Sequence, residues 1–156
     1  MMLPSRLTLP ALVVAFLVQL MLAGAANAQQ ALESLTIVSQ GGQRHAFQVE
    51  VARNEADRAQ GLMFRRSMAA DRGMLFDFAR VEPVSMWMQN TYLPLDMLFV
   101  RPDGTIARIA ANTEPLSTRT IPTGEPVLAV LELNAGTAAR LGIKMGDRIE
   151  HPLFKK

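Results

Sequence analysis

The fold of this chain is restricted above all by a series of short apolar runs separated by turn residues. These runs span residues 35–38, 73–78, 95–101 and 127–133, and glycine, proline or asparagine stands near their ends. Apolar runs of this length bounded by such residues are typical of β-strands, and tight turns join strands that lie side by side. The sequence therefore predicts a mainly β (α+β) fold, a compact antiparallel β-sandwich or partly closed barrel with two short helices.

The most regular strand is predicted after Gly41 and Gly42, which supply a hairpin turn. Apolar and polar side chains alternate from residue 44 to 51, as they do on a strand with one buried face. Residues 95–101 are apolar on both faces, which predicts a central, covered strand. Further strands are expected at 84–88, 105–110 and 148–151, with a long polar loop at 112–126.

Two short helices are predicted from their terminal residues. Asn54 is a typical N-cap, and acidic residues follow it in the first turn, where the helix dipole favours negative charge. This helix should end near Gly61, because glycine commonly stands just past a helix C-terminus. The second helix is predicted at 134–141 and is ended by Gly142.

Residues 1–28 have the pattern of a secretory signal peptide. Arg6 precedes an apolar stretch at 11–23, and Ala26-Asn27-Ala28 supplies the small residues that signal peptidase recognises. The stretch is shorter than the roughly 20 residues of a membrane-spanning helix, which argues against an uncleaved anchor. We expect cleavage after Ala28 and an exported, periplasmic or secreted domain at residues 29–156 that does not span the membrane.

Composition restricts the function of this predicted mature domain. The chain has no cysteine, so it forms no disulfide and must rely on its packed core. Its formal charge of +2 becomes +1 when residues 1–28 are removed, because Arg6 is the only charged residue among them. A nearly neutral exported domain is a poor candidate for binding nucleic acid, and we predict no nucleic-acid partner.

Four short motifs give the chain a family resemblance. They are GLMFR at 61–65, GMLF at 73–76, WMQNT at 87–91 and PLD at 94–96. In this order and spacing they resemble the domain of unknown function 192 family, and the match extends from about residue 49 to 149. Met86 departs from the resemblance, since many members have an aromatic residue there. The resemblance implies a compact β-rich domain, often behind a signal peptide, and it implies no reaction.

Asp96 is the most informative candidate side chain. It follows Leu95 in an apolar strand and shares a face with Leu98 and Val100, so its carboxylate should be partly buried and should need a partner. One interpretation is structural, with Asp96 holding a turn or pairing with an arginine. The other is a carboxylate with a shifted pKa that lines a pocket.

Five further residues are candidates for a binding site. Arg65 or Arg66 could hold an anion through a planar, bidentate contact, or both could be ordinary surface arginines. Asn90 and Thr91 could close a turn with their own side chains. Trp87 beside these polar groups also suits a ring-shaped ligand.

Other catalytic and metal-binding patterns are weak. Five methionines between residues 63 and 88 are compatible with Cu(I), but methionine is also an ordinary core residue. His45 and His151 are the only histidines, and they lack a metal-ligand spacing. No serine stands in a G-x-S-x-G sequence. We therefore predict no metal and no cofactor.

The leading functional hypothesis is a non-enzymatic domain that binds a small polar or anionic ligand. Its predicted site comprises six residues, Arg65, Arg66, Trp87, Asn90, Thr91 and Asp96. The first alternative is a hydrolase or lyase that uses Asp96 as acid or base, with an arginine stabilising negative charge. The second is a protein-interaction module of the cell envelope that uses an exposed sheet edge or an apolar patch.

Overall fold

The computed structural model describes residues 31–154. The predicted signal peptide and its cleavage site after Ala28 lie outside these residues. Seven strands form one curled sheet, and two very short strands form a second sheet. The strands are β1 Glu33–Val38, β2 Arg44–Ala52, β3 Arg72–Glu82, β4 Ser85–Met86, β5 Leu95–Val100, β6 Ile106–Ala110, β7 Ile121–Pro122, β8 Val127–Asn134 and β9 Arg148–Glu150.

Two short helices accompany the sheets, α2 at Glu55–Gln60 and α3 at Thr137–Leu141. The Asn54 side chain caps α2 by accepting a hydrogen bond from the Asp57 backbone N–H, and the helix ends at Gly61 as predicted. Gly142 ends α3 in the left-handed conformation. Within residues 31–154 no helix is long and apolar enough to cross a membrane.

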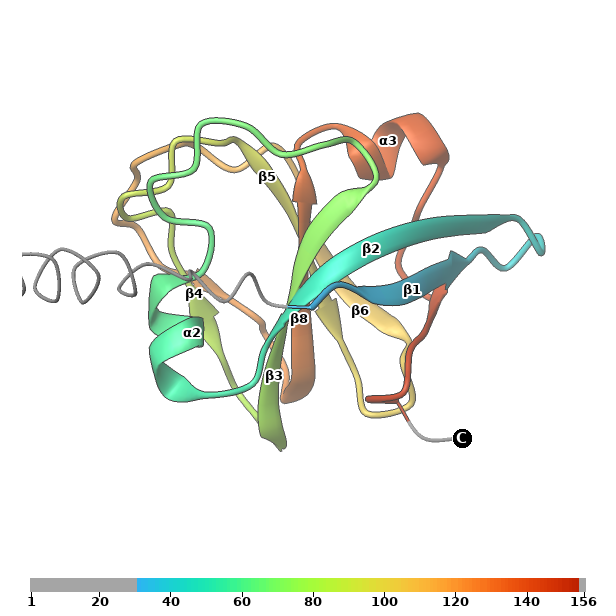
Figure 1. The fold of residues 1–156 in the computed structure, drawn as a ribbon. Helices are drawn as coiled ribbons and strands as arrows, with labels where there is room; N and C mark the ends of the chain where they lie inside the picture. Colours follow the sequence, from blue (N-terminus) through green and yellow to red (C-terminus); the bar gives the residue numbers. More distant parts are fainter. Residues whose placement is uncertain (1–30, 155–156) are drawn as a thin grey trace, which may run out of the picture.

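The large sheet curls into a half-barrel whose strand order is β6-β5-β8-β3-β2-β1-β9 (Figure 1). Its two edge strands approach each other at one end, where Thr105 and Arg148 form an antiparallel bridge. The Ile149 N–H also donates to the Gly104 carbonyl at 2.8 Å. The prediction of a mainly β, partly closed barrel with two short helices is therefore confirmed.

The structure adds three details that the sequence pattern did not predict. Strands β2 and β3 pair in parallel, because the connection at 53–71 carries α2 and returns the chain to the same end of the sheet. The predicted strand at 84–88 is only the two residues of β4. Its partner β7 lies inside the segment at 112–126 that was predicted to be loop, so the second sheet is made by residues with little strand signal of their own.

Both faces of the large sheet are buried, and each carries its own core. All six residues of β5 are buried, which confirms the predicted covered strand. Leu98 and Val100 belong to the core inside the half-barrel, whereas Leu95, Met97 and Phe99 belong to the core on the outer face. The outer core lies beneath α2, β4, β7 and the loops around them, and these elements form a covering layer.

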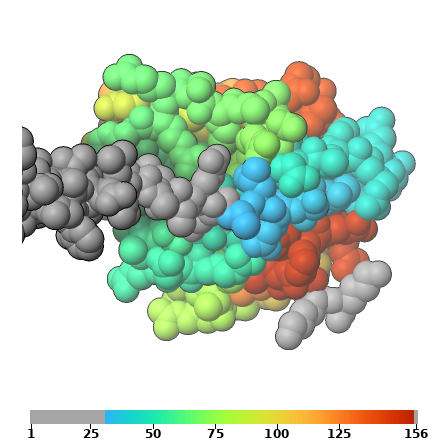
Figure 2. Space-filling view, in the orientation of Figure 1, coloured from blue at the N-terminus to red at the C-terminus, as the bar shows by residue number. Residues whose placement is uncertain are grey.

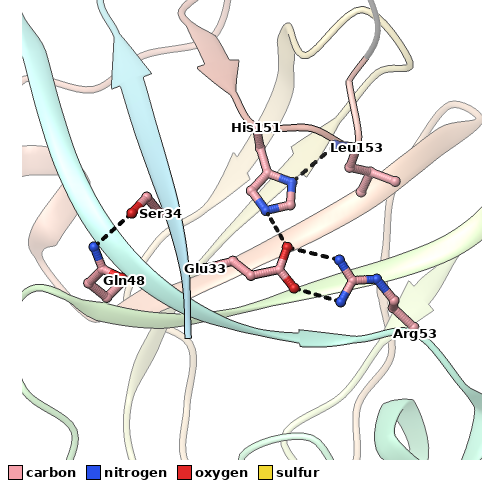
Figure 3. Close-up of polar contacts among 6 residues, drawn as sticks. All are labelled: Glu33, Ser34, Gln48, Arg53, His151 and Leu153. Carbon is pink, nitrogen blue, oxygen red and sulfur yellow. Dashed lines mark hydrogen bonds and ion pairs between the residues drawn. The ribbon is translucent and has the colours of Figure 1, made fainter. Parts of the chain in front are cut away.

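The two ends of the described chain are joined by a small polar cluster (Figure 3). Glu33 in β1 accepts hydrogen bonds of 2.7 and 2.9 Å from the Arg53 guanidinium, and His151 Nε2 lies 3.3 Å from the same carboxylate. His151 Nδ1 accepts from the Leu153 N–H, and burial lowers the pKa of this imidazole. In the space-filling view the red C-terminal segment lies directly beside blue β1 (Figure 2). The cluster has a structural role.

A substitution at Gly104 would test whether the close approach of the two sheet edges requires glycine. The φ of Gly104 is +85°, and an added Cβ would lie 2.5 Å from the Ile149 carbonyl oxygen. We expect Gly104→Ala to lower the free energy of unfolding by roughly 3 kcal/mol, because left-handed strain and the collision with the backbone add. The measurement is urea denaturation followed by circular dichroism.

Gly124 provides the matched control, since its φ is +82° and an added Cβ would meet no atom within 4 Å. Gly124→Ala should cost only the left-handed strain, about 1–2 kcal/mol. Equal losses in the two variants would show that the close approach of the sheet edges does not require glycine.

Candidate functional site

The outer face of the sheet carries a cleft between α2 and β4, which lie side by side at one end of the half-barrel (Figure 1). We name it the α2–β4 cleft. Its outer part has a volume of about 270 Å³ and is lined by Glu55, Arg58, Ala59, Phe76, Phe78, Ser85, Met86 and Trp87. A narrow inner part of about 30 Å³ shares Arg58, Ala59, Phe76, Met86 and Trp87 with the outer part, so the two are adjacent.

Glu132 of β8 lines the inner part of the cleft. Its register partners are Met74 in β3 and Met97 in β5, so buried thioether side chains flank it on both neighbouring strands. Glu132 is only 4% exposed, and its carboxyl group has no hydrogen-bond partner among residues 31–154. Burial away from water raises the pKa of this carboxyl to about 8, and the group is therefore mostly neutral at pH 7.

The walls of the cleft are largely apolar and aromatic. Phe76 lies between the two parts, Met63 contributes to the inner wall, and Trp87 is 51% exposed where the cleft opens. Thr91 adds a buried hydroxyl to the inner wall and donates to the Gln89 carbonyl at 3.2 Å. An apolar pocket with a few polar groups at fixed positions is the usual design of a small-molecule site.

Arg58 supplies the positive charge of the cleft and lines both of its parts. Its Nη1 donates to the carbonyls of Arg53 and Asp77 at 2.8 and 2.9 Å, and its guanidinium lies 5.8 Å from the centre of the Phe78 ring. These contacts fix the side chain, while Nε and Nη2 have no hydrogen-bond partner among the described residues. One edge of the guanidinium is therefore free for a planar, bidentate contact.

Three loops that contain residues with positive φ position the inner wall. Phe64 and Asn90 have φ values of 64° and 56°, a conformation that is rare for a residue as bulky as phenylalanine. The Phe64 N–H donates to the Asn90 carbonyl at 2.9 Å, which joins the loop that carries Met63 to the loop that carries Thr91. Leu116 in a third loop has a φ of 63° and donates to the Thr91 carbonyl. Such strain persists only where surrounding contacts hold it, and it is common at functional sites.

Of the six residues predicted to form the site, the structure brings three together. Trp87 and Thr91 line the inner cleft, and Asn90 precedes Thr91 in the strained loop. Arg65 instead forms a bidentate ion pair with Glu50 at 2.5 and 2.7 Å, and this carboxylate raises the pKa of Arg65. Arg66 lies over the Tyr92 ring, 5.7 Å from its centre. Neither arginine lines the cleft.

Asp96 lies on the opposite face of the sheet from the cleft, so the structure separates it from the other predicted residues. It is fully buried and accepts backbone hydrogen bonds from Asn112 at 2.9 Å, Gly136 at 3.1 Å and Ala138 at 2.9 Å. No arginine among residues 31–154 pairs with it, and its partners are backbone N–H groups. Asp96 therefore joins β5 to α3 and to the loop after β6. This arrangement favours the structural interpretation of Asp96 over a carboxylate that lines a pocket.

Sequence reasoning missed Glu132 and Arg58, the two charged residues that line the inner part of the cleft. A signal for Glu132 was present, because it is the only charged residue in the apolar run at 127–133. Arg58 had no comparable signal, since its role depends on α2 folding back beside β4. Of the methionines that suggested copper, Met63 and Met86 line the cleft, whereas Met74 and Met88 are core residues.

These features define a class of small half-barrel protein in which a short helix and a two-stranded layer frame a cleft on the outer face of the sheet. The chain belongs to the DUF192 family, described as Uncharacterized ACR, whose model matches residues 36–151. The resemblance predicted from the short motifs is thereby confirmed.

Two crystal structures are similar to this chain along most of its length. One, from Sinorhizobium meliloti 1021, is provisionally described as a transcription regulator; it is 54% identical, the match covers 78% of this chain and 94% of that one, and the TM-score is 0.77. The other, from Novosphingobium aromaticivorans DSM 12444, is described as a protein of unknown function; it is 41% identical, with 81% and 90% of the two chains covered and a TM-score of 0.76. No curated protein matches the chain.

Glu132 should make stability depend on pH. Its carboxyl has a pKa of about 8 in the folded protein and 4.5 as its ordinary value, so between these pH values the unfolded chain has released a proton that the folded chain retains. The free energy of unfolding should therefore fall as pH rises from about 4.5 to about 8, by roughly 1.4 kcal/mol per pH unit at its steepest. The measurement is urea denaturation of the wild type and Glu132→Gln across this range.

Comparison of the two proteins isolates the contribution of this one carboxyl. Glu132→Gln cannot ionise, so it should gain stability relative to the wild type as pH rises and should differ little from it near pH 4. Parallel pH profiles for the two proteins would show that Glu132 titrates normally.

Asp96 should matter for stability but not for the cleft. We expect Asp96→Asn to lower the free energy of unfolding by about 3 kcal/mol, because the amide has lost the charge that three backbone N–H groups share. Asp103→Asn is the control, since this exposed carboxylate accepts one backbone hydrogen bond, from Thr105 at 2.9 Å, and its loss should cost less than 1 kcal/mol. A small loss for Asp96→Asn in the same denaturation assay would contradict the structural role.

Proposed function

We propose that this protein is a non-enzymatic domain that binds a small polar ligand in the α2–β4 cleft, with one polar group of the ligand inside the inner part. The observation that carries the proposal is the carboxyl group of Glu132, which is buried, faces the inner cleft and has no partner among the described residues. A bound ligand would supply the missing partner.

The energetic argument concerns the cost of burying a carboxyl group. Buried polar groups in proteins are nearly always hydrogen-bonded, because removing them from water without a partner costs several kcal/mol. At neutral pH a residue that does not ionise, such as glutamine, would fold at lower cost at position 132, so stability does not explain the glutamate. Carboxyl groups with a raised pKa in a cleft are candidates for functional sites.

The dimensions of the cleft limit the size of the ligand. The outer part, at about 270 Å³, is near the lower end of small-molecule sites, and its aromatic walls suit an apolar or ring-containing portion. The inner part, at about 30 Å³, has room for a group the size of a water molecule or an ammonium group. The ligand is therefore small and has one compact polar end.

The alternatives fit the arrangement of residues less well. A hydrolase or lyase that uses Asp96 would need access to a carboxylate that is fully buried and already accepts three backbone hydrogen bonds. An interaction module that uses a free sheet edge would have little edge available at one end, because the bridge between Thr105 and Arg148 joins the two edges of the sheet there. We include export in the proposal, on the evidence of residues 1–28.

The description of the Sinorhizobium protein supplies a further alternative, a transcription regulator. DNA-reading helices in the major groove need several turns and a basic surface. The two helices described here contain six and five residues, and the predicted mature chain is nearly neutral. We therefore propose a small-molecule ligand and no nucleic-acid partner.

Trp87 provides a direct test because it is the only tryptophan in the chain and it lines the cleft. Titration with a panel of small amines, carboxylates, amides and sugars should include compounds that change its fluorescence in a saturable way. Glu132→Gln should weaken that binding at least tenfold, because one hydrogen bond to a buried carboxyl is worth about 1.4 kcal/mol or more.

Glu125→Gln is the control for this titration, since Glu125 pairs with Arg101 and does not line the cleft. This variant should bind as the wild type does. Absence of binding across the panel, or unchanged affinity in Glu132→Gln, would contradict the proposal.

A further inference from the structure

The charges of the α2–β4 cleft lie on two different elements and are held by two different means. Glu132 is fixed in the middle of the large sheet, whereas Arg58 is fixed on α2 by its Nη1 contacts and by the Phe78 ring. Each keeps part of its hydrogen-bonding capacity free: the carboxyl of Glu132 and the Nε and Nη2 groups of Arg58 have no partner in the described part of the chain.

The Glu132 carboxyl and the Arg58 guanidinium do not hydrogen-bond to each other, although both residues line the inner part of the cleft. They form no ion pair, and desolvation alone determines the raised pKa of Glu132, with no lowering by a nearby cation. An arginine in contact would have lowered that pKa, so the guanidinium is held away from the carboxyl. The space between them is bounded by Phe76, Met86 and Trp87, which contribute no charge.

A cleft with a free carboxyl at one place, a free guanidinium edge at another and apolar walls between them is complementary to one class of molecule. We infer that the ligand is a small zwitterion that carries a primary ammonium group and a carboxylate on an apolar spacer. The inference rests on the proposed function. The ammonium group occupies the inner part against Glu132, the carboxylate makes a bidentate contact with Arg58, and the spacer packs between Phe76 and Trp87.

The size and chemistry of the inner part favour an ammonium group there. A volume of about 30 Å³ admits a single small head group, and an ammonium group is about the size of water. Met63 and Trp87 border the inner part, and electron-rich aromatic rings attract cations. A carboxylate in that position would face another carboxyl group beside apolar walls, which is unfavourable as soon as Glu132 ionises.

Binding of an ammonium group should be linked to proton release. In the empty cleft Glu132 is mostly protonated below pH 8, and the ammonium group pairs with its ionised form. Affinity should therefore increase about tenfold per pH unit between pH 6 and pH 7 and level off above pH 8. The other charged groups that line the cleft among the described residues are Arg58 and, in the outer part on α2, Glu55.

The experiment compares 6-aminohexanoate with three probes that each lack one feature. Hexylamine lacks the carboxylate, 6-acetamidohexanoate lacks the ammonium group, and glycine lacks the spacer. Isothermal titration of the wild type at pH 7.5, in two buffers with different ionisation enthalpies, measures affinity and proton release together. We expect 6-aminohexanoate to bind at least tenfold more tightly than any of the other three and to release protons.

Two variants assign each end of the ligand. Glu132→Gln should reduce the affinity for 6-aminohexanoate at least tenfold and abolish proton release, while the affinity for 6-acetamidohexanoate stays the same. Arg58→Lys keeps the positive charge and loses the bidentate contact, so it should weaken 6-aminohexanoate severalfold and leave hexylamine unchanged. Glu125→Gln, outside the cleft, should behave as the wild type does.

The outcomes separate this inference from the proposed function. Equal binding of 6-aminohexanoate and 6-acetamidohexanoate, with no effect of pH, would overturn the ammonium assignment. If all four probes fail while another member of the wider panel quenches Trp87 and is lost in Glu132→Gln, the cleft binds a ligand of a different class. If nothing in either set binds, both the ligand class and the proposed function are wrong.

Discussion

The pairing of β8 with both β3 and β5 is the constraint on which the rest of the structure depends. These three strands form the middle of the large sheet, and both faces of the sheet are covered there. Successive side chains of β8 point to opposite faces, so Leu131 and Leu133 enter the core of the half-barrel while Val130 and Glu132 face the covering layer. A polar residue at position 132 cannot avoid burial, because both faces of the sheet are covered at this point of β8.

The covering layer decides whether that buried carboxyl meets a protein partner or a cavity. The layer is made of a two-residue strand pair, a six-residue helix and loops, and it does not seal the sheet completely. Three non-glycine residues with positive φ, Phe64, Asn90 and Leu116, hold its loops together through backbone hydrogen bonds. The strained loops and the unpartnered Glu132 therefore lie on the same face of the sheet. Both features lower stability, and such features are expected at functional sites.

The half-barrel fold is shared with related proteins. The half-barrel is similar to two crystal structures that are 54% and 41% identical to this chain, so the fold itself is common to all three. Neither description names a ligand. Residues 61–63 of the first motif, and Trp87 and Thr91 of the third, line the inner part of the α2–β4 cleft. The PLD motif at 94–96 places Asp96 beneath α3. The motifs thus serve both the cleft and the internal support of the fold.

The sequence by itself determined most of the elements, because their signals are local. Alternation at 44–51, the apolar run at 95–101 and the caps at Asn54 and Gly142 each predicted an element that the structure contains. It also placed Trp87, Asn90 and Thr91 near one another, since they are neighbours in the chain. The parallel pairing of β2 with β3 and the β4–β7 pair involve segments far apart in sequence, and no local pattern encodes them.

Only the tertiary structure determines which charged residues line the cleft. Asp96 and Glu132 are both carboxylates in apolar strands, and the sequence gives no reason to prefer either. The alternation of the strands sends Asp96 to the face where α3 presents free backbone N–H groups, and sends Glu132 to the face where the covering layer leaves a cavity. Arg58 joins Glu132 only because α2 folds back beside β4, and Arg65 is removed from the site because Glu50 lies within reach of it. Composition and periodicity determine which residues are buried, whereas only the packing of distant segments determines which of the buried charges finds a partner.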